Sequence, residues 1–381
     1  MTRENETNAT NEASEARDAK SSEPAASADP ATAGAHDQHD QHEEEGSMKS
    51  FLVAFSVMVG TLLCAELMFR ESQLLKKIPK GYHLSAKQEE YRKVGGDIVV
   101  TGDSRMFHGV VPSAMTETLK QKTGKTYQLY NMGIPSGTTP IFLIAAHEAA
   151  RHKPPPKAFV IGVTPALFSC CDTVASLHVS AGVNPENSVL LAQGTILPNT
   201  EEAGNSIAYG ASRLLQFRTD VVNALKDGTI PPPLSFQDHG WITMGPRLSA
   251  TTQDTRARGR AVGYADLMDK SKGSAIRKPS VNFVREAVQV LQRAGVKVAI
   301  IGTPQSRQLD WYHDHAHVYY EYIDAVQAIA NETNVPFVDL NSFPGLENID
   351  FVDGDHLSEP GAVKFTNYLS ATVLAPLLEG N

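Results

Sequence analysis

The sequence predicts an α/β protein whose core is a parallel sheet of about five strands. Two observations lead to this fold class. Five short apolar runs have the length of strands buried on both faces, and segments with helical spacing of apolar residues separate most of them. Parallel neighbours need a crossover connection, which is usually a helix, so this alternation favours a doubly wound sheet.

The predicted elements follow one another with short turns between them. In LQRAGVKVAIIG, for example, a helix, a glycine stop and a strand occupy twelve residues. The predicted strands are DIVVTG (97–102), TYQLYNMG (126–133), KAFVIGV (157–163), VKVAIIGT (296–303) and VPFVDL (335–340), and the predicted helices cover 111–121, 140–151, 206–226, 280–294, 316–333 and 359–377.

The first 48 residues differ from the rest of the chain. They contain no Leu, Ile, Val or aromatic residue, and 12 acidic side chains stand against 3 basic ones. Such a segment cannot bury enough apolar surface to offset its ordering entropy, so we expect a disordered acidic tail over 1–48. Its HDQHDQH run (His36, His39, His42) is either a loose set of metal ligands or, as we favour, a solvated polar tract.

The run FLVAFSVMVGTLLCAELMF (51–69) is long and apolar enough to cross a membrane. Its 19 residues would form a helix of about 28 Å, close to the thickness of a hydrocarbon core. A cleaved signal peptide and a buried soluble helix are the alternatives, but no small-x-small cleavage pattern follows the run. We therefore expect an uncut signal anchor over 49–69, and Met48 is an alternative start of the protein.

Flanking charges and cysteine content are weaker evidence for the compartment in which the rest of the chain lies. Lys49 precedes the apolar run, whereas Arg70, Lys76, Lys77 and Lys80 follow it, which by the positive-inside rule favours a cytoplasmic domain. Cys64 lies in the run, and Cys170 and Cys171 are adjacent, so no disulfide framework is visible.

Beyond the anchor we expect a stalk over 70–94 and a folded domain over 95–381. Residues 166–279 are too many for one crossover connection, which predicts an insertion over one end of the sheet. Because it follows a strand, the insertion is either a lid over the ligand crevice or a plain elaboration of the fold.

Three residues have the chemistry of a catalytic triad. Ser104 ends the first strand in TGDSR, and DFVDGDHLSEPGA places Asp353 and His356 in one tight loop after the last strand. A serine nucleophile needs a general base, and the base needs an orienting acceptor. Both loops open at the carboxyl edge of a parallel sheet, so Ser104 and His356 are expected to meet. Asp355 competes with Asp353 as the orienting acid.

Attack on an ester also requires donors for the developing oxyanion. The backbone N–H of Ser104 at a helix N-terminus is one candidate. The loop YNMGIPSGTTP after the second strand offers a second, because Gly137 lets the backbone approach a ligand closely.

TGDSR, NMGIPSGTT and DGDH resemble the first, second and last sequence blocks of the SGNH/GDSL hydrolases. The resemblance covers roughly 95–378 and implies a flavodoxin-like α/β/α three-layer sandwich. It also implies that Ser104 is the nucleophile, Gly137 an oxyanion donor, and Asp353 and His356 the rest of the triad. The third block, usually Gly-x-Asn-Asp, is replaced by GVTP, where Thr164 is the candidate substitute for the missing donor.

The sequence is most similar to one branch of that family, which contains the alginate O-acetylation and lipoteichoic acid D-alanylation proteins. The features that carry this similarity are the anchor and the segments GDSR, GVTP, GTPQS and DGDHLSEPGA. This similarity implies a catalytic domain outside the membrane, against the flanking charges, and often a membrane-bound O-acyltransferase as partner.

Four further residues are candidates for lining the substrate cleft, each with a structural alternative. Arg105 follows the nucleophile and suits an anionic group or a salt bridge, and His108 lies one helical turn after Ser104, in the cleft or on the helix surface. Gln305 and Arg307 end a strand at the same edge, where ordinary turn chemistry is equally compatible. The HDHAH run (His313, His315, His317) is a weak zinc candidate, and we expect no metal site.

The sequence therefore predicts a membrane-anchored serine esterase or O-acyltransferase acting on acyl esters, most simply acetyl esters, of a cell-envelope polysaccharide. The alternatives are an esterase or lipase for small esters and a non-catalytic carbohydrate-binding or assembly protein. There is no dinucleotide-type glycine-rich loop, P-loop or basic stripe, so we expect neither a cofactor nor nucleic-acid binding.

Overall fold

The structure is a computed structural model, and it divides the chain into two compact units, Met1–Thr61 and Leu62–Asn381. The residues it describes are 37–72, 77–78, 82–169, 212, 217–230, 232–269, 276–307, 316–341 and 343–380.

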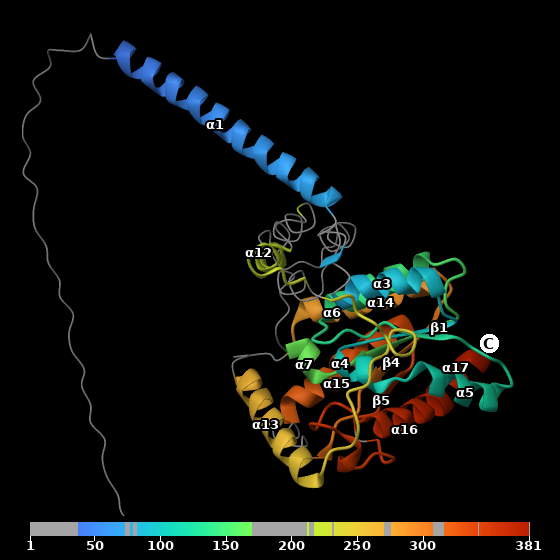
Figure 1. Ribbon diagram of the computed structural model, residues 1–381. Coiled ribbons are helices and arrows are strands. Elements are labelled where there is room, and N and C mark those ends of the chain that lie inside the picture. The colour runs from blue at the N-terminus through green and yellow to red at the C-terminus, as the bar shows by residue number, and fades with distance from the viewer. Residues whose placement is uncertain are drawn as a thin grey trace, which may run out of the picture. The chain divides into compact units, whose positions relative to one another are not determined.

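The predicted parallel sheet of five strands is confirmed. Its order is β2-β1-β3-β4-β5, and every neighbouring pair is parallel (Figure 1). Each strand lies inside one of the apolar runs of the sequence. The strands are β1 (Ile98–Thr101), β2 (Leu129–Asn131), β3 (Ala158–Val163), β4 (Lys297–Gly302) and β5 (Phe337–Asp339).

The strand order places a topological switch point next to β1. Val99 pairs with Tyr130 of β2 on one side and with Phe159 of β3 on the other, so the chain leaves β1 in one direction and later returns past it. In open parallel sheets ligands bind at the carboxyl ends of the strands near such a point. The loops that follow β1, β2 and β3 are thus the expected lining of a site.

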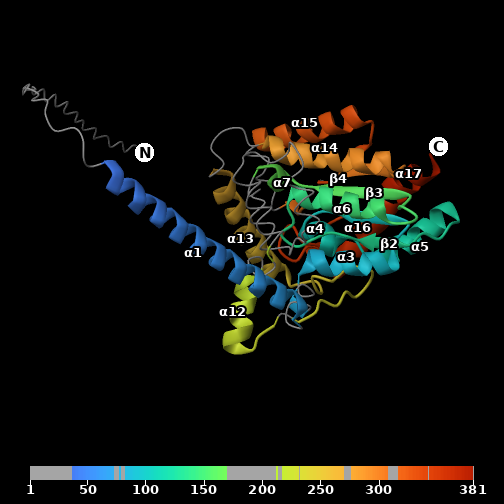
Figure 2. The same cartoon turned by 90° about the horizontal axis from the view of Figure 1, so that it is seen from above.

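Alternate residues of the strands enter two separate cores. Val99 and Ile161 belong to one core, together with side chains of α3 (His83–Val94), α6 (Thr139–Arg151), α14 (Lys278–Arg293) and α15 (Ala316–Thr333). Val100 and Val160 belong to the other core, with side chains of α5 (Pro112–Thr123), α16 (Glu359–Leu369) and α17 (Ala375–Glu379). Figure 1 shows α6 and α14 together and α16 apart from them, and Figure 2 shows α14 beside α15. This alternation follows from the two-residue period of a strand and explains why the runs are apolar throughout.

Most helices of the domain begin or end at residues suited to that position. Asp103 and Ser358 cap α4 and α16 with their side chains, and Gly124 ends α5 in the left-handed conformation. The bounds are α3 (His83–Val94), α4 (Ser104–Gly109), α5 (Pro112–Thr123), α6 (Thr139–Arg151), α7 (Pro165–Ser169), α12 (Arg218–Asp227), α13 (Ala250–Asp269), α14 (Lys278–Arg293), α15 (Ala316–Thr333), α16 (Glu359–Leu369) and α17 (Ala375–Glu379), with a π-helical turn over Ser370–Leu374.

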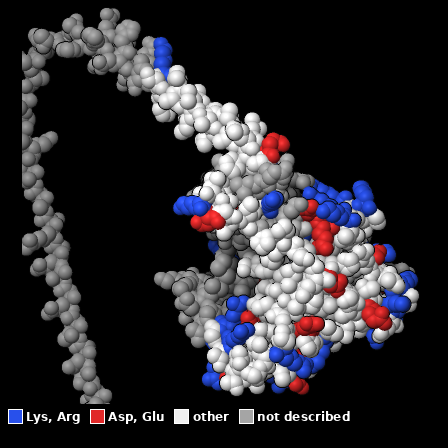
Figure 3. Space-filling view, in the orientation of Figure 1, with Lys and Arg blue, Asp and Glu red and all other residues white. Residues whose placement is uncertain are grey.

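The N-terminal helix α1 (Asp37–Glu71) contains the apolar run. Met48–Glu71 has the length and composition of a membrane span, and its large apolar side chains are exposed. Its 24 residues make about 36 Å of helix, enough to cross a hydrocarbon core of about 30 Å. In Figure 3 this segment shows few charged side chains.

The helix starts earlier than predicted, at Asp37, within the segment expected to be disordered. Once an apolar segment has nucleated a helix, each further residue costs little to add, and acidic residues are favourable near the N-terminal end. The rest of the predicted tail lies outside the described residues.

The segment predicted as a stalk contributes a helix to the domain. Four residues of α3 are buried, namely Leu84, Lys87, Gln88 and Tyr91. Leu84 and Tyr91 belong to the same core as α6 and α14. The burial of one face of α3 means that the folded domain includes it.

The described parts of the predicted insertion include α12, α13 and the loop before α13, and this loop contacts the carboxyl edge of the sheet. The loop before α13 forms a small bridge between Asp238 and Trp241, and the N–H of Asn131, at the end of β2, donates to His239 (2.9 Å). Residues 170–211, which include Cys170 and Cys171, lie outside the described residues.

We expect Gly240→Ala to destabilise the protein more than Gly228→Ala. Both glycines have positive φ, +86° and +68°, which costs an L-residue about 1–2 kcal/mol. A Cβ at Gly240 would lie 2.2 Å from the carbonyl oxygen of Asn131, whereas a Cβ at Gly228 meets no described atom within 4 Å. The total cost at Gly240 is therefore roughly 3 kcal/mol or more. Thermal unfolding followed by tryptophan fluorescence measures both, and equal falls in Tm would contradict the contact.

Candidate active site

Ser104 is the first residue of α4 and directly follows the loop that ends β1. The Asp103 side chain accepts a hydrogen bond from the N–H of Arg105 (2.9 Å), which fixes the start of the helix. The serine is therefore held at the carboxyl edge of the sheet by a cap that the sequence GDSR itself supplies.

Asp353 and His356 lie in a small hairpin after η3 (Asn348–Asp350), a 3-10 turn. Phe351 and Leu357 form its bridge, and the N–H of Val352 donates to the carbonyl of His356 (2.8 Å). Gly354 has a φ of +96°, so the tight turn needs a glycine there. The hairpin presents the carboxylate and the imidazole on the same side.

The three predicted triad residues are in contact. The Nε2 atom of His356 lies 2.7 Å from the Oγ atom of Ser104, and the Nδ1 atom lies 2.9 Å from each carboxylate oxygen of Asp353. These distances are those of hydrogen bonds. The arrangement joins residues 252 positions apart because both loops leave the same edge of the sheet.

A second carboxylate also contacts His356. The Oδ1 atom of Asp355 lies 3.1 Å from Nδ1 of the imidazole. Asp355 is only 1% exposed and is paired with Arg105 (3.1 Å) and with Arg260 of α13 (3.0 Å). Arg105 was predicted either to bind an anionic substrate group or to form a salt bridge. The structure supports the salt bridge, because this side chain is buried, binds Asp355 and is not open to a substrate.

These charges set the protonation of the site. Burial alone would lower the pKa of His356, but the hydrogen bonds and charges of Asp353 and Asp355 outweigh it and raise the pKa to about 9. Burial would raise the pKa of Asp355, yet Arg105, His356 and Arg260 hold it well below its usual value. The imidazole is thus held in its charged form by two carboxylates, of which one is neutralised by arginines.

The three predicted oxyanion donors differ in availability. The Ser104 N–H is among the first amides of α4, which lack an acceptor within the helix. The Gly137 N–H instead donates to the carbonyl of Ile134 (2.9 Å), so the turn would have to open to release it. The hydroxyl of Thr164 is buried and has no hydrogen-bond partner in the described part of the chain.

Sequence reasoning missed Lys87, a buried cation from α3. Its ammonium group donates to the carbonyl oxygens of Asn131 (2.7 Å) and Gly133 and lies 4.2 Å from the ring centroid of Phe107. Phe107 belongs to the helix of Ser104, and Gly133 lies in the loop after β2. Lys87 therefore connects the helix that begins at Ser104 to the candidate oxyanion loop. No motif marks it, because only the tertiary fold brings α3 to these loops.

His108, predicted to lie either in the substrate cleft or on the helix surface, contacts His356. Its ring makes an edge contact with the ring of His356 (5.9 Å between centroids), and its Nδ1 atom lies 2.8 Å from the carbonyl of Ile242. Burial is the main reason that its pKa falls to about 4. The indole N–H of Trp241 donates to the carbonyl of His108 (2.9 Å), so the insertion holds this histidine in place.

The side chains of Asp353, Asp355 and His356 also form the one cluster with metal-binding potential among the described residues, with ligand atoms within 4.8 Å of one another. Two arginines already neutralise Asp355, and a cation there would have to compete with them. The geometry favours the hydrogen-bonded arrangement. His36, His39, His42, His313, His315 and His317 lie outside the described side chains.

Comparison with known proteins gives a partial match. Residues 259–371 match a family described as "Protein of unknown function (DUF1574)", which covers less than a third of the chain. The matched segment includes Asp353 and His356 but not Ser104. No curated protein matches the chain.

We expect Lys87→Met to destabilise the domain by roughly 2–5 kcal/mol, because it leaves two buried carbonyl groups without their donor. Lys93→Met on the same helix is the control: Lys93 is exposed and, among the described residues, its ammonium group pairs with Glu89, so its loss should cost less than about 0.5 kcal/mol. Urea unfolding compares the two variants. Equal stabilities would show that the contacts of Lys87 contribute little.

Proposed function

We propose that this protein is a membrane-anchored serine hydrolase or O-acyltransferase of the SGNH type. The observation that carries the proposal is the continuous chain of contacts from Ser104 through His356 to Asp353. A hydroxyl, an imidazole and a carboxylate in this order are the parts of a serine acyl-transfer site.

The fold supports the same conclusion. The strand order 2-1-3-4-5 is that of flavodoxin-like doubly wound sheets, and two helix-lined cores on alternating strand residues agree with a three-layer α/β/α sandwich. In this arrangement the triad lies where the loops after β1 and β5 come together. Fold likeness alone would not indicate the chemistry, which rests on the site.

The proposed reaction proceeds through an acyl-enzyme. Neutral His356 takes the proton of Ser104 Oγ while this oxygen attacks the ester carbonyl carbon, and Asp353 stabilises the imidazolium. The carbon–oxygen bond of the leaving alcohol then breaks, and the alcohol takes the proton from Nε2. A second hydroxyl, of water or an acceptor, repeats these steps in reverse and releases Ser104.

The negative charge that develops on the carbonyl oxygen needs donors. We propose the Ser104 N–H and the Thr164 hydroxyl as these donors, since neither has an acceptor among the described residues. Gly137 would join them only after release of its bond to Ile134.

We further infer that the domain lies on the outer side of the membrane and transfers acetyl groups to an envelope polysaccharide beside a membrane-bound O-acyltransferase. The candidate span at Met48–Glu71 supports anchoring in a membrane, and the resemblance of the sequence blocks supports the outer side and the acetyl transfer. Hydrolysis of small esters uses the same acyl-enzyme with water as acceptor.

A second candidate function is non-catalytic binding of an envelope glycan. Two observations favour it: the Gly137 amide is engaged in a turn, and the pKa of His356 is about 9, so the imidazole is mostly charged at neutral pH. A charged imidazole cannot accept the serine proton. A test for an activated serine separates the two functions.

We expect the full chain in lipid nanodiscs to react with a fluorophosphonate, whose phosphorus becomes bonded to Ser104 Oγ as fluoride leaves. Labelling followed by gel fluorescence should disappear in Ser104→Ala and fall at least a hundredfold in His356→Ala, because both remove an essential part of the triad. Ser113→Ala, which alters an exposed serine nearby, should label normally. A folded wild type that never labels, at any pH, would leave the binding function as the better explanation.

The labelling rate should rise with pH up to about 9, because only neutral His356 accepts the proton and about one imidazole in a hundred is neutral at pH 7. Asp355→Asn removes one of the two carboxylates that raise this pKa, and it removes a negative charge beside Arg105 and Arg260. The inflection should therefore move roughly one pH unit or more downward.

The control for this shift is Asp254→Asn, which changes an acid on α13 that pairs with Arg258. Its pH profile should coincide with that of the wild type. An inflection that stays near 9 in Asp355→Asn would show that Asp353 alone sets the pKa.

A further inference from the structure

The end of β4 carries two buried polar side chains with unmet hydrogen bonds. Gln305 is 6% exposed and Ser306 is 1% exposed. Neither the amide nitrogen nor the amide oxygen of Gln305 has a partner in the described part of the chain, and the same holds for the Ser306 hydroxyl. Three unmet polar atoms thus occur in two consecutive residues.

Such a pair is costly unless something else binds it. A buried polar group without a partner costs about 1–3 kcal/mol, and most buried side-chain polar atoms in proteins do find one. If Gln305 and Ser306 served only to form a turn, smaller or apolar residues would form it equally well. The cost therefore points to a partner beyond the described residues, for which water and a ligand are the candidates.

A cavity lies at these residues. It has a volume of about 130 Å³, roughly four times the 30 Å³ that one water molecule occupies in the liquid. Its lining combines amides, one carboxylate and one guanidinium with aromatic and aliphatic side chains. The lining includes Gln305, Ser306, Arg307, Phe343, Glu347 and Phe351.

The cavity adjoins the hairpin of the triad. Phe351, which lines it, also forms the bridge at the base of the hairpin. The N–H of Ser306 donates to the carbonyl of Gly354 (2.7 Å), between Asp353 and His356. A molecule in the cavity would therefore lie against the segment that positions the general base.

We propose that this cavity is a subsite for one sugar ring of the acyl acceptor. A pyranose ring presents hydroxyl groups at its edge, which both donate and accept hydrogen bonds, and apolar C–H groups on its faces. Gln305 offers a donor and an acceptor, Ser306 a hydroxyl, and the rings of Phe343 and Phe351 a surface for the C–H face. The assignment rests on the proposed acyl transfer and names the class of its acceptor.

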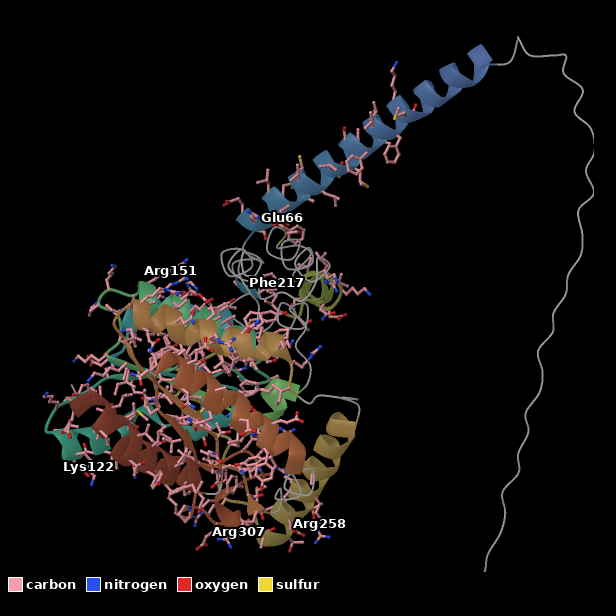
Figure 4. The ribbon with its side chains drawn as sticks, turned by 180° about the vertical axis from the view of Figure 1, so that it is seen from behind. Glu66, Lys122, Arg151, Phe217, Arg258 and Arg307 are labelled. Atoms are coloured by element: carbon pink, nitrogen blue, oxygen red, sulfur yellow. The ribbon has the colours of Figure 1, made fainter. Side chains whose placement is uncertain are left out.

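Other ligands fit the lining less well. An acyl chain would leave the amide of Gln305 and the hydroxyl of Ser306 without partners. A small anion would meet Arg307, but Glu347 lines the same cavity and opposes it. Arg307 is exposed and lies, in Figure 4, at the same end of the domain as Arg258. Gln305 and Arg307, both predicted to line the substrate cleft, are thus both part of the proposed subsite, with Gln305 as its main contact.

The experiment measures binding of methyl glycosides to the full chain in phosphatidylcholine nanodiscs, by saturation-transfer NMR. Alkyl maltoside detergents are avoided, since their headgroup is itself a sugar. The probes are the methyl glycosides of glucose, galactose, mannose, N-acetylglucosamine and glucuronic acid. We expect saturable binding of at least one, weakened at least fivefold in Gln305→Ala and in Ser306→Ala. Preference for the glucuronide would identify an acidic acceptor ring, and preference for a neutral glycoside a neutral one.

The matched control is Gln121→Ala, which removes an exposed amide on α5 that bonds only to Glu117. Its affinity should equal that of the wild type. Gln305→Glu, which keeps the size of the side chain, covers the case in which Gln305→Ala unfolds. Absence of saturable binding for all five glycosides, or equal binding by all variants, would overturn the subsite and leave ordered water as its occupant.

Fluorophosphonate labelling of the same preparations keeps this result separate from the proposed function. Glycoside binding without labelling would retain the subsite and reject acyl transfer. Labelling without glycoside binding would retain the serine enzyme and reject the sugar subsite.

Discussion

The whole arrangement depends on the parallel direction of all five strands. Because every strand ends at the same edge of the sheet, the loops after β1 and β5 meet there, and Ser104 comes within 2.7 Å of His356. The two cores on alternating strand residues hold this edge rigid. A hydrogen bond between side chains 252 positions apart is possible only because the sheet fixes both loops at once.

Charged residues of both the core domain and the insertion set the electrostatics at that edge. Asp355 contacts His356 from one side while Arg105 and Arg260 neutralise it from the other, and Arg260 comes from α13. The insertion also contacts His108 through Trp241 and Ile242. Its described part therefore belongs to the environment of the imidazole, and the charge state of the site depends on how α13 packs.

The segment after the apolar helix is equally involved. Lys87 of α3 binds the carbonyl groups of Asn131 and Gly133 and the ring of Phe107, so α3 packs against the helix that begins at Ser104. Burial holds the pKa of Lys87 well below its usual value, and the two carbonyl groups and the aromatic ring are the partners that its nitrogen finds in the interior. The folded domain therefore includes α3, which precedes the first strand.

The parallel sheet, the apolar helix and the three residues of the candidate site could be predicted from the sequence alone, because two-residue and helical periodicities, Gly354 in a turn and Asp103 as a cap are local features. Asp355 and Arg105 were visible too, but the partner that each takes was not. The three-dimensional structure was needed to show that Arg105 binds Asp355, that the Gly137 amide is engaged, and that Lys87 reaches the site. These outcomes depend on contacts between segments that are distant in the sequence. Such contacts produce no local periodicity or motif from which they could be predicted.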